Sequence, residues 1–201
     1  MEILFIAIAA VLSVYIVSRL TGGTTDAMLK QYEIFTKRFG LEQKTAHSKW
    51  GAGIGEHHSL KGEYNGYPVS LYDHFSGKGR SKERWTSLTF ETLFTGSIDF
   101  VLEGRNGQAA ACYQSGEGAK AVELGESLAS AYSLRSNEAE VIRVLEAERV
   151  LYRLENFAKN ETAGCFRVSK GFLEYREVGR MTKEAQRARF QQVIVLLSEL
   201  A

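Results

Sequence analysis

The apolar and polar positions of this chain divide it into one uninterrupted apolar run and a longer region of mixed patterns. Residues 3–17 are almost entirely apolar, and no charged residue lies between Glu2 and Arg19. A spanning helix needs roughly 20 apolar residues, with about 17 as the lower limit. Arg19 can reach the interface with its long side chain, so we expect residues 1–20 to form a transmembrane anchor. A cleaved signal peptide and a buried core helix are the alternatives, but the run lacks a basic n-region and a polar stripe.

Cations flank this run on one side only. Arg19, Lys30, Lys37 and Arg38 follow it, and no Lys or Arg precedes it. Because Lys and Arg accumulate on the cytoplasmic side of membrane segments, we expect a single-pass protein with its N-terminus outside and its domain in the cytoplasm.

The pattern changes after the run. Residues 21–25 are expected to be a short linker, and residues 26–39 carry apolar side chains at helical spacing. Gly40 is a typical C-terminal stop for that helix. The polar stretch over residues 43–58 contains glycines and is expected to lack regular structure.

The clearest local pattern is a hairpin over residues 60–75. The Asn-Gly pair at 65–66 readily adopts the positive φ angles of a two-residue turn, and the residues after it alternate between apolar and polar. Further strands are expected over residues 84–94 and 97–103, and residues 109–113 could pair back. The connections are too short for parallel crossovers, so these strands predict an antiparallel meander.

The second half of the chain is expected to be mostly helical. Apolar residues recur at helical spacing over residues 137–158 and 182–200, and a small hairpin is expected over residues 165–176. Strands followed by helices predict the α+β class, with helices packed on an antiparallel sheet in one domain over residues 26–201.

Composition excludes some partners. The chain has 201 residues, with 25 Lys and Arg against 24 Asp and Glu, so no overall positive field would attract nucleic acid. The two cysteines, Cys112 and Cys165, do not make a disulfide scaffold, and we expect reduced thiols that fit a cytoplasmic domain.

Candidate residues for catalysis or metal binding are weak. His57 and His58 are adjacent and would point to opposite faces of a strand, and the chain lacks the spacings of zinc motifs. Asp73 and His74 would diverge in the same way, and no nucleophile elbow accompanies them. The glycine-rich segment 51–55 lacks the preceding strand and the lysine of a phosphate-binding loop. We therefore expect no catalytic, cofactor-binding or metal-binding residues, and no cofactor.

A basic segment is the remaining candidate site. Residues 77–84 hold four cations, namely Lys78, Arg80, Lys82 and Arg84. On a membrane-tethered domain these side chains could contact anionic lipid headgroups, with about 1 kcal/mol from each cation near the surface. The alternative is a solvated hairpin tip whose charges keep strand edges from aggregating.

A hairpin motif carries a resemblance to known proteins. Gly62, Tyr64, Gly66 and Val69 form a Gly-x-Tyr-x-Gly-x-x-Val pattern that follows the N-terminal anchor. With the long helical second half, this layout resembles a loose group of uncharacterised bacterial membrane-anchored α+β proteins. The resemblance implies the architecture and a bacterial source, and hence an inner (cytoplasmic) membrane location. It implies no catalytic residue.

These features favour a membrane-tethered, non-enzymatic accessory or scaffold domain that is a subunit of a membrane-associated protein assembly. Its expected partners are the lipid bilayer, through residues 1–20, and other membrane proteins, but not nucleic acid. The alternative is a lipid- or ligand-binding module that uses the sheet face and the basic segment 77–84. An enzyme with a non-standard site is a third hypothesis.

Overall fold

A computed structural model of the chain describes residues 23–47, 56–76, 82–92, 99–105, 119–138, 141–159 and 164–201. The expected anchor, residues 1–20, and the expected strand at 109–113 lie outside these ranges. Within the ranges that are described, no helix has the length and apolar character needed to cross a membrane.

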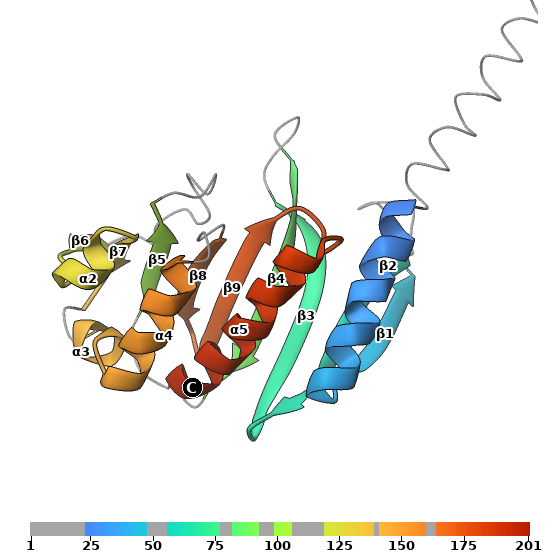
Figure 1. Ribbon diagram of the computed structural model, residues 1–201, viewed down its shortest axis with the longest axis horizontal. Helices are drawn as coiled ribbons and strands as arrows, with labels where there is room; N and C mark the ends of the chain where they lie inside the picture. Colours follow the sequence, from blue (N-terminus) through green and yellow to red (C-terminus); the bar gives the residue numbers. More distant parts are fainter. Residues whose placement is uncertain are drawn as a thin grey trace, which may run out of the picture.

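The centre of the described structure is an antiparallel sheet of nine strands (Figure 1). Its strand order is β1-β2-β3-β4-β9-β8-β5-β7-β6. The strands are β1 (Glu42–His47), β2 (Glu56–Tyr64), β3 (Tyr67–Ser76), β4 (Glu83–Glu91), β5 (Phe100–Gly104), β6 (Lys120–Val122), β7 (Tyr132–Ser136), β8 (Gly164–Ser169) and β9 (Phe172–Val178).

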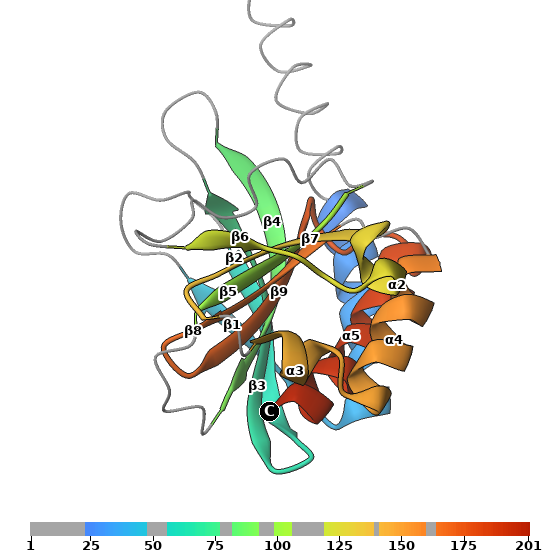
Figure 2. The ribbon, with the colours of Figure 1, turned by 90° about the vertical axis from the view of Figure 1, so that its left-hand side faces the viewer.

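Helices cover one face of this sheet (Figure 2). The first helix spans residues 23–39 and is drawn in blue. The others are α2 (Glu126–Ala129), α3 (Val141–Leu145), α4 (Glu148–Lys159) and α5 (Glu184–Leu200). The first helix, α5 and α4 lie side by side over the sheet, so the fold has two layers.

The expected α+β class and antiparallel sheet are confirmed, but the meander is only partly correct. Strands β1 to β4 follow one another in space as they do along the chain. The late hairpin β8-β9 is inserted between β4 and β5, where Leu88 lies opposite Tyr175 and Leu102 lies opposite Phe166. This insertion buries the helix-facing side chains of the hairpin, among them Phe166 and Tyr175, in the middle of the sheet. The order of the strands along the chain does not reveal this position.

Several local expectations need correction. The stretch 43–58, expected to be irregular, contributes β1 and the start of β2. Residues 23–25, expected in the linker, are already helical. The expected helix over 137–158 is divided into α3 and α4, and Glu146 at the division accepts a hydrogen bond from the Gly125 backbone N at 3.1 Å.

The hairpin turn at 65–66 is confirmed by its backbone. Asn65 has φ of 53° and Gly66 has φ of 86°, as a two-residue turn between twisted strands requires. The core beneath the helices contains an aromatic cluster in which neighbouring ring centroids are 4.7 to 5.7 Å apart. Its members are Phe157, Phe166, Tyr175 and Phe190.

Candidate functional site

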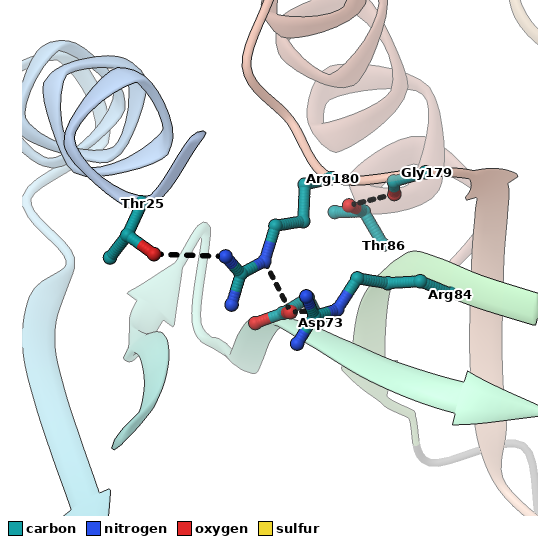
Figure 3. Close-up of polar contacts among 6 residues, drawn as sticks. All are labelled: Thr25, Asp73, Arg84, Thr86, Gly179 and Arg180. Carbon is teal, nitrogen blue, oxygen red and sulfur yellow. Dashed lines mark hydrogen bonds and ion pairs between the residues drawn. The ribbon is translucent and has the colours of Figure 1, made fainter. Parts of the chain in front are cut away.

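A buried ion cluster lies beside the start of the first helix (Figure 3). Asp73, in the second half of β3, has a side chain that is only 2% exposed. Its Oδ2 accepts a hydrogen bond from the Arg180 Nε at 3.1 Å. The Arg84 Nε lies 3.0 Å from the same oxygen, but the angle at this nitrogen makes the contact an ion pair without a hydrogen bond. A single carboxylate therefore faces two guanidinium groups.

Arg180 extends the cluster to the N-terminal part of the described chain. Its Nη1 donates to the Thr25 Oγ1 at 3.0 Å, while its Nε is bound to Asp73. Thr25 belongs to the first turns of the first helix, and Arg180 lies in the connection between β9 and α5. One side chain thus joins three segments that are far apart in the sequence (Figure 3).

The backbone that carries Arg180 is held by β4. The Gly179 backbone N donates to the Arg84 carbonyl oxygen at 2.7 Å, and the Thr86 Oγ1 donates to the Gly179 carbonyl oxygen at 2.8 Å. Gly179 has φ of +91°, a conformation that glycine adopts without the strain other residues would meet. These contacts fix the direction in which Arg180 leaves the loop.

Burial dominates the electrostatics of this cluster. Tyr32, in the first helix, is fully buried and its hydroxyl makes no hydrogen bond to any part of the chain that is described. Desolvation raises the pKa of Tyr32, and the Asp73 carboxylate raises it further. Burial also lowers the pKa of Arg84, although Asp73 opposes this shift. The arrangement is that of a structural ion cluster in a low-dielectric environment.

Of the four cations in the basic segment 77–84, only Lys82 and Arg84 belong to the described residues. Lys78 and Arg80 lie outside the described residues, and Lys82 is exposed. Arg84 differs, because it pairs with Asp73 and its guanidinium lies 4.5 Å from the centre of the Phe75 ring. Arg84, one of the four residues expected to contact lipid, is therefore bound within the protein.

The opposite sheet face carries a second group of polar side chains. Asp73 and His74 point to different faces, as strand alternation predicts, and His74 lies with its ring centroid 5.5 Å from that of Tyr72. Burial lowers the pKa of His74. Ser87 on β4 donates to the Glu174 Oε1 at 2.8 Å rather than to His74. Within the described chain, these residues therefore do not form a catalytic triad.

Two other histidines, His57 and His58, lie on strand β2, which pairs with β1. His58 is buried, and its Nδ1 lies 3.2 Å from the Thr45 Oγ1 on the neighbouring strand. His57 pairs with Ala46 in the same ladder. In the described ranges, no group of three or more His, Cys, Asp or Glu side chains could hold a metal ion. The glycine-rich segment 51–55 lies outside those ranges.

The expectation of a reduced thiol is wrong for Cys165. This residue is fully buried on β8, beside Trp85 and Val101, and takes part in a disulfide bond. The other cysteine of the chain, Cys112, lies outside the described residues. Stable disulfides are typical of proteins in oxidising compartments.

The sequence did not lead us to expect the ion cluster, although it contains one indication of it. Val69, Leu71 and Asp73 alternate on one face of β3, so the sequence places a carboxylate on an apolar face. A carboxylate in that position needs a buried counter-charge. The sequence gives no indication that Arg180 supplies it, because 107 positions separate the two residues.

Comparisons with known proteins bear on the fold alone. No protein-family model matches the chain, and no curated protein matches it. Among solved structures, the chain is similar to the crystal structure of the mycobacterial trehalose monomycolate transport factor A, TtfA. The TM-score is 0.53 at 10% sequence identity, and the match covers 86% of this chain and 93% of TtfA. The two chains therefore share an α+β fold.

Proposed function

We propose that the protein is a membrane-tethered, non-enzymatic accessory domain that acts as a subunit of a membrane-associated assembly. The observation that carries the proposal is the contact of Arg180 with both Thr25 and Asp73. Through Arg180, the start of the first helix is bonded to the sheet. An anchor formed by residues 1–20 would therefore hold the folded domain close to the bilayer.

The buried charges support a structural role rather than catalysis. Asp73 faces Arg180 and Arg84, and Glu177 on β9 accepts two hydrogen bonds from Arg189 on α5, both at 2.8 Å. Bidentate pairing of this kind fixes the geometry of the two side chains, as expected of a structural contact. These carboxylates connect the layers of the fold.

The similarity of fold to TtfA motivates a narrower form of this proposal. TtfA is, by its title, a trehalose monomycolate transport factor. We extend the proposal to this chain only at that level, as a subunit of a membrane transport assembly.

The second candidate function is a module that binds anionic lipid. It is favoured by the position of Lys82, which is exposed immediately before β4, the strand that supplies Arg84 to the ion cluster. On a membrane-tethered domain, each cation that reaches anionic headgroups contributes about 1 kcal/mol. The two functions are compatible, because lipid contact would orient an accessory domain.

Two observations disagree about the side of the membrane. The cations at Arg19, Lys30, Lys37 and Arg38 favour a cytoplasmic domain. The disulfide at Cys165 favours an oxidising compartment. We retain the single-pass orientation with the N-terminus outside as the proposal. Protease treatment of right-side-out spheroplasts tests it, since a cytoplasmic domain stays protected and digestion of the intact domain would reverse the orientation.

The accessory role is tested by purification of the tagged full-length chain in a mild detergent. We expect partner proteins to co-purify in a fixed ratio. A second chain, in which residues 1–20 are replaced by an unrelated single-pass helix, shows whether the domain or the anchor holds the partner. Recovery of both chains as lone monomers would contradict the proposal.

A further inference from the structure

A hollow between the first helix, α4 and α5 is lined by both polar and apolar side chains. Its volume is about 270 Å³, which suits a small ligand group rather than a drug-sized molecule. The first helix, α4 and α5 all contribute to it. The side chains that matter to its chemistry are Arg38, Arg153, Gln191, Phe157, Val195 and Leu196.

Gln191 supplies a buried donor without an acceptor. The residue is 8% exposed, and its Oε1 accepts a hydrogen bond from the Arg38 Nη1 at 2.9 Å. Because a guanidinium group has only donors, this contact fixes the amide orientation and leaves the Nε2 on the other side. That nitrogen is buried and has no hydrogen-bond partner within the described part of the chain. A buried donor of this kind costs free energy until an acceptor reaches it.

The charge of the hollow is also uncompensated. Arg153 pairs with Glu199, so its charge is balanced at the rim. Arg38 bonds to Gln191 and lies 5.6 Å from the centre of the Phe39 ring, and no carboxylate in the described ranges pairs with it. The hollow is therefore lined by one cation that no described carboxylate pairs with, and the unpaired N–H donor of Gln191 lies buried in its wall, above an apolar floor.

We propose that this hollow binds a carboxylate group that carries a short aliphatic substituent. One carboxylate oxygen accepts from the Gln191 Nε2, the negative charge faces Arg38, and the substituent packs against Val195 and Leu196. A monoanion fits better than a phosphate, because a single uncompensated cation does not balance a doubly charged group. The carboxylate could belong to a small acid or to the C-terminus of a polypeptide, and the two share this chemistry.

The test is isothermal titration calorimetry on the full-length chain in detergent micelles. The ligands are 4-methylpentanoate, its neutral analogue 4-methylpentanamide, and the dipeptide N-acetyl-Ala-Leu with either a free or an amidated C-terminus. We expect each acid to bind about tenfold or more tightly than its amide, because only the acid satisfies both Arg38 and the amide donor. Tighter binding of the dipeptide acid than of the small acid would identify a chain terminus as the source.

Substitutions at Gln191 test whether binding of the acid depends on this hollow rather than on the protein surface in general. Gln191→Leu removes the donor, and Gln191→Glu keeps the contact with Arg38 while it repels the ligand, so one of the two can fail to fold without loss of the test. Either variant should weaken acid binding about tenfold or more. Lys37→Gln, on the same helix but solvent-exposed, is the matched control and should change affinity less than about twofold.

The proposal is overturned if the amides bind as tightly as the acids, if the folded Gln191 variants keep full affinity, or if neither acid binds at about 10 mM. Each of these outcomes leaves the accessory role intact, since that role rests on partner recovery and not on this hollow.

Discussion

Arg180 and Asp73 join the loop before α5 to strand β3 through a contact of 3.1 Å between Nε and Oδ2, although 107 positions separate them. The same guanidinium donates to Thr25 at 3.0 Å. This relationship ties the beginning and the end of the described domain to its sheet. The stability of the domain and the position of its first helix therefore depend on the same side chain.

Asp73→Asn tests the contribution of this cluster to stability. The substitution keeps the shape of the side chain but leaves Arg180 and Arg84 without a counter-charge in a buried position. Loss of one partner of a buried ion pair costs about 3 kcal/mol, so we expect a decrease of that order in the free energy of unfolding. Urea unfolding of the full-length chain in micelles measures it. Glu33→Gln, which breaks an exposed pair with Lys37, is the control and should have no measurable effect. Equal stability of the two variants would contradict the structural role of Asp73.

The basic segment should respond unequally to neutralisation. Lys82 is exposed, whereas Arg84 pairs with Asp73 and stacks on Phe75. Lys82→Gln should reduce binding to anionic vesicles about fivefold and leave stability unchanged, as expected for a loss of about 1 kcal/mol per cation. Arg84→Gln should instead lower the urea midpoint. Flotation with vesicles of phosphatidylglycerol, compared with vesicles of phosphatidylcholine, measures the first effect. If binding is the same for both kinds of vesicle, the segment does not contact anionic lipid.

Local sequence patterns predicted the parts of the fold that depend on neighbouring residues. The turn at 65–66 could be recognised because Asn-Gly favours the required φ angles, and the hairpin of β8 and β9 because of its apolar alternation. Strand β1 could not be recognised in the same way, since Glu42, Lys44 and Thr45 are exposed and give no apolar periodicity. Its pairing with β2 comes from backbone hydrogen bonds along the ladder.

Long-range contacts explain what the sequence could not predict. The insertion of β9 beside β4 depends on how the helical layer covers the sheet, and no short segment encodes that position. The same holds for the hollow at Gln191, because Arg38 lies 153 positions away and approaches only when the first helix packs beside α5. The expected lipid contacts stay a prediction, and the partner that Arg84 finds in Asp73 depends on the fold.

Gly164→Ala tests the packing of the inserted hairpin. A Cβ at Gly164 would lie 2.4 Å from the Arg176 carbonyl oxygen and 2.6 Å from the Tyr175 hydroxyl, and neither atom can move freely. The strand would have to shift, so we expect a loss of about 1 to 3 kcal/mol in the free energy of unfolding. Gly23→Ala is the matched control, because a Cβ there meets nothing within 4 Å. Urea unfolding of both variants should show a decrease for Gly164→Ala alone, and a normal midpoint for that variant would mean that β8 and β9 are further apart.

Buried phenols should make the domain sensitive to alkaline pH. Burial raises the pKa of Tyr32 and Tyr132, and it raises the pKa of Tyr175 together with the neighbouring Glu177 carboxylate. An unfolded tyrosine loses its proton near about pH 10. The folded state then binds more protons than the unfolded state, so stability is fully present below pH 10 and decreases as the pH rises above it. Each such tyrosine contributes a slope of about −1.4 kcal/mol per pH unit.

Tyr32→Phe isolates one of these contributions. The Tyr32 hydroxyl is buried without a hydrogen bond in the described structure, so its removal should leave stability at pH 8 unchanged or slightly higher. Above pH 10 the decrease in the free energy of unfolding should become shallower by about 1.4 kcal/mol per pH unit, because one buried phenol no longer resists ionisation. Urea titrations between pH 8 and about pH 11 measure the slope. Tyr152→Phe removes an exposed phenol, 66% accessible, and should leave the slope as in the parent protein. Identical slopes for the two variants would show that Tyr32 is accessible to solvent and that the first helix is not packed on the sheet.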